Sequence, residues 1–275
     1  MHGAGNDYVY VDLISQPDLQ DHPAIRQPGQ LAIDVSARRT GIGSDGLVLI
    51  YPTEDDAAAR MRMFNADGSE AEMCGNALRC VAYLLIHRHG ESQSFSIQTG
   101  RGPLSVFEGD GSICVEMGRP VLDARSIPTT LAGDPPVDTL LKLGELKLSV
   151  SCVSMGNPHC VVFDNDLTDD LVVGCGPQIE HAACFPSRTN VEFAQLIDRS
   201  NIKVRVWERG SGETAACGTG ACAVVVAGVL SGRCDRTVNV ALPGGTLCVD
   251  WRSDDNVYLS GPVAEVFSGE WSLKI

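Results

Sequence analysis

The sequence lacks a long apolar run, since no stretch approaches the about 20 residues that a membrane helix needs. Its first residues carry no basic segment followed by an apolar core, so we expect no signal peptide and a cytoplasmic protein. No Cys-x-x-Cys pair occurs, and we therefore expect no metal site. None of the few lysines lies in a segment typical of a Schiff-base site, so we expect no pyridoxal phosphate and no other cofactor. The lysines are Lys142, Lys147, Lys203 and Lys274.

Positive charge is also scarce. There are 35 acidic and 21 basic residues, a net charge of −14, and this argues against nucleic acid or an anionic membrane as a partner. The length of 275 residues predicts about two domains. The eleven cysteines are an odd number without a secretory signal, so we expect no disulfide framework and interpret most thiols as small buried hydrophobic groups.

The chain contains two copies of one pattern. Residues 62–76 recur at residues 205–219, an offset of 217 − 74 = 143 residues, and the same offset pairs Gly102-Pro103-Leu104 with Gly245-Thr246-Leu247. Two copies in one order predict two domains of one fold. Equivalent loops of such a pair face each other, so we expect the functional site at the domain interface. The Pro- and Asp-rich stretch Arg119 to Asp138 reads as the linker.

Short β-rich runs dominate the pattern of apolar residues, and we predict only three helices. The mixture predicts an α+β fold with two pseudo-symmetric domains, each a largely antiparallel β-sheet or barrel wrapped around a central helix. The expected helices are Gly29–Ala37, Cys74–Arg88 and Cys217–Ser231. The expected strands are Tyr8–Leu13, Leu47–Tyr51, Arg60–Asn65, Phe95–Thr99, Leu104–Glu108, Ser112–Met117, Cys160–Phe163, Val191–Ile197, Lys203–Glu208, Leu247–Trp251 and Val257–Ser260.

Cys74 and Cys217 are the candidate catalytic residues. Each lies at a predicted helix N-terminus and precedes a glycine. The free amides there favour a thiolate and can also bind a carboxylate. Inversion of a stereocentre needs one group that removes a proton and another that delivers one to the opposite face, and a duplicated fold with one cysteine per copy supplies both. Two ordinary buried cysteines are the alternative, which we prefer for Cys80 and Cys222, but the matched pair favours function.

The two copies differ beside the cysteines. Asn65 corresponds to Glu208, and Asp7-Tyr8 corresponds to Pro158-His159, so the two thiols are expected to differ in pKa. Arg209 is the better candidate for binding a substrate carboxylate, whereas Arg79 reads as a surface charge. Glu70 and Glu213 read as loop or capping residues. Asparagines at 6, 65, 76, 157 and 190 suggest a polar pocket for a zwitterion.

At these positions the sequence resembles the diaminopimelate epimerase family. The resemblance spans nearly the whole chain in the family's order. It implies interconversion of LL- and meso-diaminopimelate in lysine biosynthesis, without a cofactor. The matching motifs are His2-Gly3-Ala4-Gly5-Asn6-Asp7, Phe64-Asn65-Ala66-Asp67-Gly68-Ser69, Met73-Cys74-Gly75-Asn76, Gly156-Asn157-Pro158-His159, Thr189-Asn190-Val191-Glu192-Phe193, Glu208-Arg209-Gly210 and Ala216-Cys217-Gly218-Thr219-Gly220.

The resemblance also implies residue roles and an assembly. Cys74 and Cys217 would be the acid/base pair, tuned by His159 and Glu208. The chain would form a homodimer of two-domain subunits, with residues 1–118 and the returning residues 263–275 in one domain and residues 119–262 in the other. The reacting carboxylate would lie on the helix-start residues Gly75, Asn76, Gly218 and Thr219, and the rest of the substrate on Asn6, Asn65, Asn157, Asn190 and Arg209.

Some positions depart from the family pattern, and two other readings stay open. Few strand residues precede His2, which leaves the first strand short, and Gly46 replaces a polar side chain that contacts substrate in some members. Proline or hydroxyproline racemases typically carry His where this chain has Asn76. A non-catalytic ligand-binding or thiol-redox protein would not need both cysteines.

Overall fold

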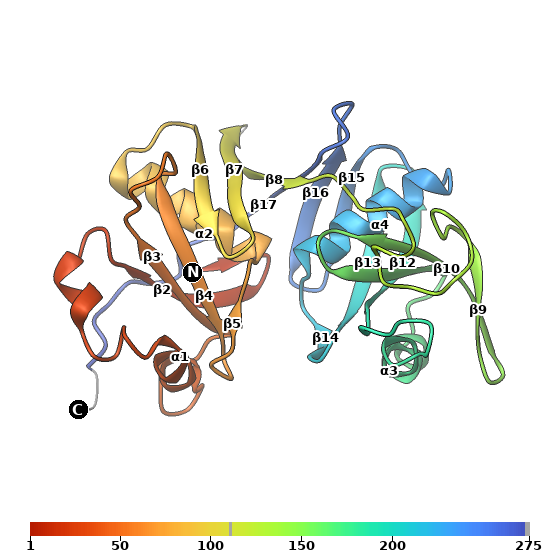
Figure 1. The fold of residues 1–275 in the computed structure, drawn as a ribbon, viewed down its shortest axis with the longest axis horizontal. Helices are drawn as coiled ribbons and strands as arrows, with labels where there is room; N and C mark the ends of the chain where they lie inside the picture. The colour runs from red at the N-terminus through yellow and green to blue at the C-terminus, as the bar shows by residue number, and fades with distance from the viewer. Residues whose placement is uncertain (110–111, 273–275) are drawn as a thin grey trace. The chain divides into compact units, whose positions relative to one another are not determined.

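The computed structural model describes residues 1–109 and 112–272 (Figure 1). The chain divides into two compact units. Unit 1 consists of Met1–Val115 together with the chain from Gly261 onward, and unit 2 consists of Glu116–Ser260. Each unit is a mainly antiparallel sheet that packs against one long helix.

Unit 1 places its central helix α2 (Gly75–Leu84) directly after the loop that contains Cys74. A π-helical segment, Leu85–His89, extends this helix to Gly90, whose left-handed backbone ends it. The other elements of unit 1 are β1 (His2–Gly3), β2 (Asn6–Asp12), a 3₁₀ helix (Pro17–Asp21), α1 (Pro28–Ser36), β3 (Gly46–Tyr51), β4 (Ala59–Asn65), β5 (Glu70–Ala71), β6 (Ser94–Thr99), β7 (Gly102–Gly109), β8 (Ser112–Gly118) and β18 (Val263–Ala264).

Unit 2 is built in the same order around α4 (Gly218–Leu230), which follows Cys217. Small and β-branched residues fill α4, and nearly every side chain on it is buried, as expected of a helix that is apolar on all faces. The other elements of unit 2 are β9 (Thr139–Leu143), β10 (Leu146–Ser154), β11 (Pro158–Phe163), a π-helical segment (Asp170–Cys175), α3 (Gly176–Glu180), β12 (Asn190–Asp198), β13 (Asn201–Glu208), β14 (Gly212–Thr214), β15 (Thr237–Leu242), β16 (Gly245–Trp251) and β17 (Val257–Gly261).

Strand pairing shows that the two units share one topology. In unit 1, β2 pairs parallel with β3, β3 antiparallel with β4, and β4 parallel with β6. In unit 2, β11 pairs parallel with β12, β12 antiparallel with β13, and β13 parallel with β15. The registers also agree, since Tyr8 lies opposite Gly46 and His159 opposite Asn190. The predicted α+β fold with two similar halves is therefore confirmed.

The end of the chain completes unit 1. Strand β18 pairs antiparallel with β1, which pairs with β2. In unit 2, β9 pairs with β10, which pairs with β11. Strand β18 therefore occupies in unit 1 the position that β9 occupies in unit 2. It comes from the C-terminal end of the chain, whereas β9 precedes the strands of its own unit.

The structure differs from the sequence predictions in the linker and in several secondary-structure elements. The stretch 119–138 is not a free linker, because Ile127 is buried in the core of unit 2 and Val121 bridges Ser154. Strands β9, β10 and β15 and the short helix α3 were not predicted from the sequence. Strand β15 alternates exposed and buried residues and so lacks a continuous apolar run, and β9 exposes both Leu140 and Lys142.

Over 1–109 and 112–272, no helix has the length and apolar character needed to cross a membrane. Within the same ranges, no group of three or more His, Cys, Asp or Glu side chains is arranged to hold a metal ion.

Candidate active site

Cys74 and Cys217 occupy equivalent positions at the start of α2 and α4. Both are N-cap residues with extended backbone, at φ −140° and ψ 121° for Cys74 and φ −125° and ψ 111° for Cys217. Their carbonyls accept the first helical hydrogen bonds, from Leu78 at 2.9 Å and Ala221 at 3.0 Å. The free amides of each first turn are consequently directed toward the region next to the sulfur, where they can bind an anion.

Two ion pairs, one in each unit, hold the strands that lead into the cysteine loops. Arg62 on β4 donates two hydrogen bonds to Glu70 on β5, at 2.7 and 2.8 Å. Arg205 on β13 does the same to Glu213 on β14, at 2.7 and 2.9 Å. Both glutamates were expected to be loop or capping residues. The structure instead shows bidentate pairs at the same offset of 143 residues, each fixing the hairpin before a cysteine.

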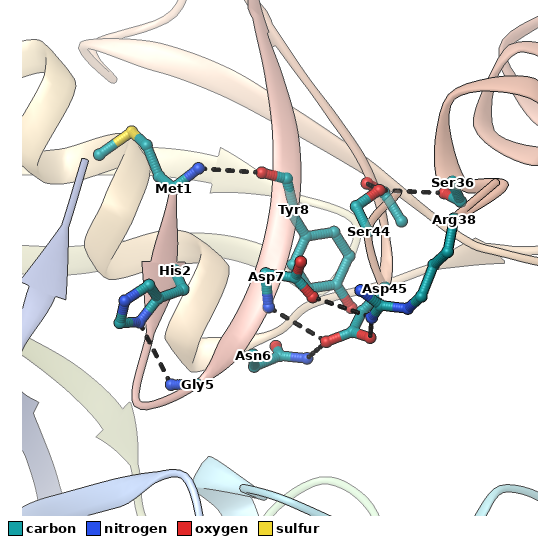
Figure 2. Close-up of polar contacts among 11 residues, drawn as sticks. Met1, His2, Gly5, Asn6, Asp7, Tyr8, Ser36, Arg38, Ser44 and Asp45 are labelled. Carbon is teal, nitrogen blue, oxygen red and sulfur yellow. Dashed lines mark hydrogen bonds and ion pairs between the residues drawn. The ribbon is translucent and has the colours of Figure 1, made fainter. Parts of the chain in front are cut away.

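In unit 1, a polar network surrounds Asn6 (Figure 2). The Cys74 thiol donates to Asn6 Oδ1 at 3.5 Å, and Asn6 Nδ2 donates to Asp45 Oδ2 at 3.1 Å. The Asp7 amide donates to the same carboxylate oxygen at 3.1 Å, and Arg38 donates to Asp45 Oδ1 at 2.9 Å. Asn65 is turned to Ser69, to which it donates at 3.0 Å.

Arg79 is fully buried, so its interpretation as a surface charge is wrong. Its guanidinium donates to Asn76 Oδ1 at 2.8 Å and to the Gly75 carbonyl at 3.4 Å. The aliphatic part of the side chain allows it to lie within a helix that is otherwise packed on the sheet. The Asn76 side chain is therefore held by Arg79, and only its backbone amide is directed for ligand binding.

In unit 2, a chain of hydrogen bonds connects a buried carboxylate to Cys217. Glu192 Oε1 lies 2.7 Å from His159 Nδ1, and both side chains have no exposed surface. His159 Nε2 lies 3.0 Å from Asn157 Oδ1, and Asn157 Nδ2 donates to the Thr219 hydroxyl at 3.3 Å. That hydroxyl lies 3.5 Å from Cys217 Sγ. Asn157 and Thr219 therefore link His159 to Cys217 by hydrogen-bond contacts.

The charges around Cys217 oppose its ionisation. Burial raises the pKa of the Cys217 thiol well above its ordinary value, and the carboxylates of Glu208 and Glu192 raise it further. The Thr219 hydroxyl and the Gly220 amide lower it. Burial also raises the pKa of Glu208, against the effect of the Thr214 hydroxyl, which donates to it at 2.5 Å. The surroundings of Cys217 therefore favour the protonated thiol.

Asn190 and Arg209 lie at the edge of this site. Asn190 is buried, donates from Nδ2 to the Pro158 carbonyl at 2.9 Å and accepts from the Arg209 amide at 2.9 Å. The Arg209 side chain is solvent-exposed and donates to the Ser187 carbonyl at 3.1 Å. Asn190 therefore fixes the backbone of the loop that carries Arg209.

The structure brings the expected residues together within each unit. Asn6, Gly75 and Asn76 gather around Cys74, and Asn157, Gly218 and Thr219 around Cys217. Asp45, Glu192 and Thr214 support these residues, and none of the three was identified as a site residue from the sequence. A buried-strand position was an available signal for Glu192, but no sequence pattern marked the other two.

Solved structures define the class of fold. The chain matches a probable proline racemase from Agrobacterium radiobacter with a TM-score of 0.64 and 12% identity, covering 94% of this chain and 88% of that one. A hydroxyproline epimerase from *Agrobacterium vitis* gives a TM-score of 0.62 and 14% identity, covering 94% and 86%. At such low identity these likenesses establish only the fold, which this chain shares with both proteins.

Sequence comparison defines the family. The family model described as diaminopimelate epimerase matches residues 1–122 and 151–266. The diaminopimelate epimerase of Desulforudis audaxviator is 49% identical over 98% of this chain and 97% of its own length. That of Trichodesmium erythraeum is 46% identical over 98% and 96%. The chain belongs to the diaminopimelate epimerase family, which confirms the resemblance inferred from the sequence.

Proposed function

We propose that this chain interconverts LL- and meso-diaminopimelate with Cys74 and Cys217 as the two acid/base groups. The single observation that supports this most is the pair of thiols at the N-caps of α2 and α4, the equivalent helices of a duplicated topology. The family and the names of the relatives support diaminopimelate as the substrate.

In the proposed reaction one proton leaves the α-carbon and another is added to its opposite face. One cysteine, as thiolate, removes the α-proton and becomes a thiol, and the electron pair stays on the α-carbon beside the carboxylate. The other cysteine, as thiol, delivers its proton to the opposite face and becomes a thiolate. The free amides at residues 75–76 and 218–219 would stabilise the carboxylate as negative charge spreads into it. No cofactor is consumed, and both sulfurs must reach one α-carbon.

The other proposed residues act on the thiols or hold the substrate. His159 and Glu208 would tune Cys217, one through the hydrogen-bond chain and the other by its charge. Asn6, Asn157 and Thr219 would contact substrate directly. Asn65, Asn190 and Arg209 would form the binding region for the distal amino-acid end, with Asn190 acting through the Arg209 loop.

The test is exchange of the α-proton in deuterated water. Wild-type protein should introduce deuterium at the α-carbon of LL-diaminopimelate and leave proline and hydroxyproline unlabelled. Cys74→Ala and Cys217→Ala should each lower kcat by at least about 10³-fold, because each variant lacks one of the two proton-transfer groups. Cys80→Ala, a matched change of a buried thiol outside the mechanism, should retain activity. Labelling of proline instead, or full activity without Cys74, would refute the proposal.

We also propose a cytoplasmic homodimer, as the family resemblance implies. Light scattering of the purified protein should give twice the mass of the 29.3 kDa chain. A monomer mass at micromolar concentration would contradict the dimer, and recovery outside the cytoplasmic fraction would contradict the location.

A further inference from the structure

Asp45 makes contacts that matter for Asn6. It precedes β3, and its carboxylate accepts hydrogen bonds from the Asn6 side chain, the Asp7 amide and the Arg38 guanidinium (Figure 2). A carboxylate can only accept such bonds, so the NH₂ group of Asn6 must face it. The other end of the amide, Oδ1, is thereby directed to Cys74. Asp45 thus determines which end of Asn6 faces the sulfur.

The equivalent asparagine of unit 2 is turned the other way. Asn157 occupies the position of Asn6, as the matching registers of Tyr8 and His159 show. Its Oδ1 lies against His159, and its Nδ2 is directed to Thr219 beside Cys217. By the same registers, the position of Asp45 is taken by Thr189, whose hydroxyl donates to the Asn190 carbonyl. One thiol therefore faces an acceptor and the other lies on the donor side of its asparagine.

We propose that Asp45 is a positioning residue of the first half-site, holding the Asn6 amide so that its carbonyl oxygen stays directed at Cys74. Its expected effect on kinetics rests on the proposed function, whereas the orientation of Asn6 does not. With Asn6 fixed in this way, the half-site offers an acceptor to the thiol proton or to an ammonium group of bound substrate. It disfavours a free thiolate until the substrate arrives.

Several other titratable and charged groups lie near Cys74 and Asp45. Tyr10 and Cys80 lie close enough to interact electrostatically with Cys74, and Arg79 lies beside Cys80. Arg38 and Asp7 complete the cluster around Asp45. A useful set of variants must therefore separate the orientation of Asn6 from the charge of Asp45.

Three variants achieve this. Asp45→Ala removes the acceptor and frees the Asn6 amide to turn its NH₂ group toward the sulfur. Asp45→Asn removes the charge but keeps an oxygen that can accept from both Asn6 and the Asp7 amide. Asp7→Asn is the matched control, since it removes one negative charge from the same cluster and keeps the Asn6–Asp45 contact.

The first readout needs no substrate. The pH dependence of Cys74 alkylation by iodoacetamide, measured by peptide mass spectrometry, should shift to lower pH in Asp45→Ala, because a freed NH₂ group stabilises the thiolate. Asp45→Asn and Asp7→Asn should stay close to wild type. In an Asn6→Ala background the Asp45→Ala change should have no further effect. Equal shifts in Asp45→Ala and Asp45→Asn would show a charge effect and overturn the proposal, as would a shift that persists without Asn6.

The second readout is kinetic. In the epimerase assay, Asp45→Ala should lower kcat/KM by about 10–100-fold, and Asp45→Asn should restore it to within a few-fold of wild type. An inactive wild-type protein would refute the proposed function, while the alkylation series would still test Asp45. Asp45→Ala with wild-type kcat/KM would overturn the positioning role.

Discussion

At the scale of single residues, the two thiols have different surroundings. Cys74 faces the carbonyl oxygen of Asn6, whereas Cys217 lies near two buried carboxylates, Glu192 and Glu208. In the proposed reaction one cysteine gains a proton while the other loses one. The surroundings of each sulfur must therefore allow both its thiol and its thiolate form. Where unit 1 has Asn65, unit 2 has Glu208, whose carboxylate raises the pKa of the Cys217 thiol.

Removing the charge of Glu208 tests this directly. A carboxylate repels a neighbouring thiolate and raises the pKa of Cys217, so Glu208→Gln should lower that pKa and move Cys217 alkylation to lower pH. Peptide mass spectrometry across a pH series measures it. Glu145→Gln is the control, because that carboxylate is exposed in the turn between β9 and β10. A curve that stays in place, or moves to higher pH, would show that Glu208 does not act through charge.

At the scale of elements, two hairpins position the cysteine loops, and each is fixed by an Arg–Glu pair. The pair in unit 2 is the less exposed, with side-chain exposures of 17% for Arg205 and 30% for Glu213, against 32% and 47% for Arg62 and Glu70. Solvent screens the more exposed pair more strongly. The two hairpins therefore depend on their ion pairs to different extents.

Neutralising each glutamate should reveal this difference. Glu213→Gln should cost about 1–2 kcal/mol of unfolding free energy, and Glu70→Gln about 0.5 kcal/mol. Urea unfolding followed by circular dichroism measures both. The pKa of Glu70 is lowered by Arg62, so its contribution is present above the unfolded pKa and is lost as pH falls through the folded pKa. A larger loss in Glu70→Gln than in Glu213→Gln would contradict the ranking.

At the scale of the whole molecule, unit 1 depends on residues from both ends of the chain. Strand β18 pairs with β1, and Glu265 forms an ion pair with Arg88. Without these residues, β1 would lose one of its two neighbouring strands. Unit 2 contains no residue beyond Ser260, so the pairing of β16 with β17 over Val257–Ser260 does not depend on the end of the chain.

A chain that ends at Ser260 should consequently have a destabilised unit 1. Trp207 and Trp251, the tryptophans that remain, both lie in unit 2, and their fluorescence should still show a cooperative urea transition. Limited proteolysis should cleave within Met1–Val115 at a urea concentration that leaves the full-length protein intact. Loss of the tryptophan transition in the shortened chain would show that unit 2 also needs the C-terminal residues.

The sequence predicted those elements whose signal lies within a short stretch of the chain. The strand runs and the helices after Cys74 and Cys217 were predicted because apolar period and Gly-flanked polar loops are local signals. Arg79 was misread because its burial depends on packing around α2, which no local pattern reports. Asp45 was missed because its role depends on a contact with Asn6, 39 residues away.

The late position of β18 in the sequence has a consequence for protein synthesis. Translation produces residues 1–115 first, yet the strand that completes their sheet is made after all of unit 2. Domains usually fold in the order in which they leave the ribosome. Here β18 begins at Val263, directly after β17 of the second repeat ends at Gly261, so the first repeat cannot be completed before the second and stays incomplete until the final stage of elongation.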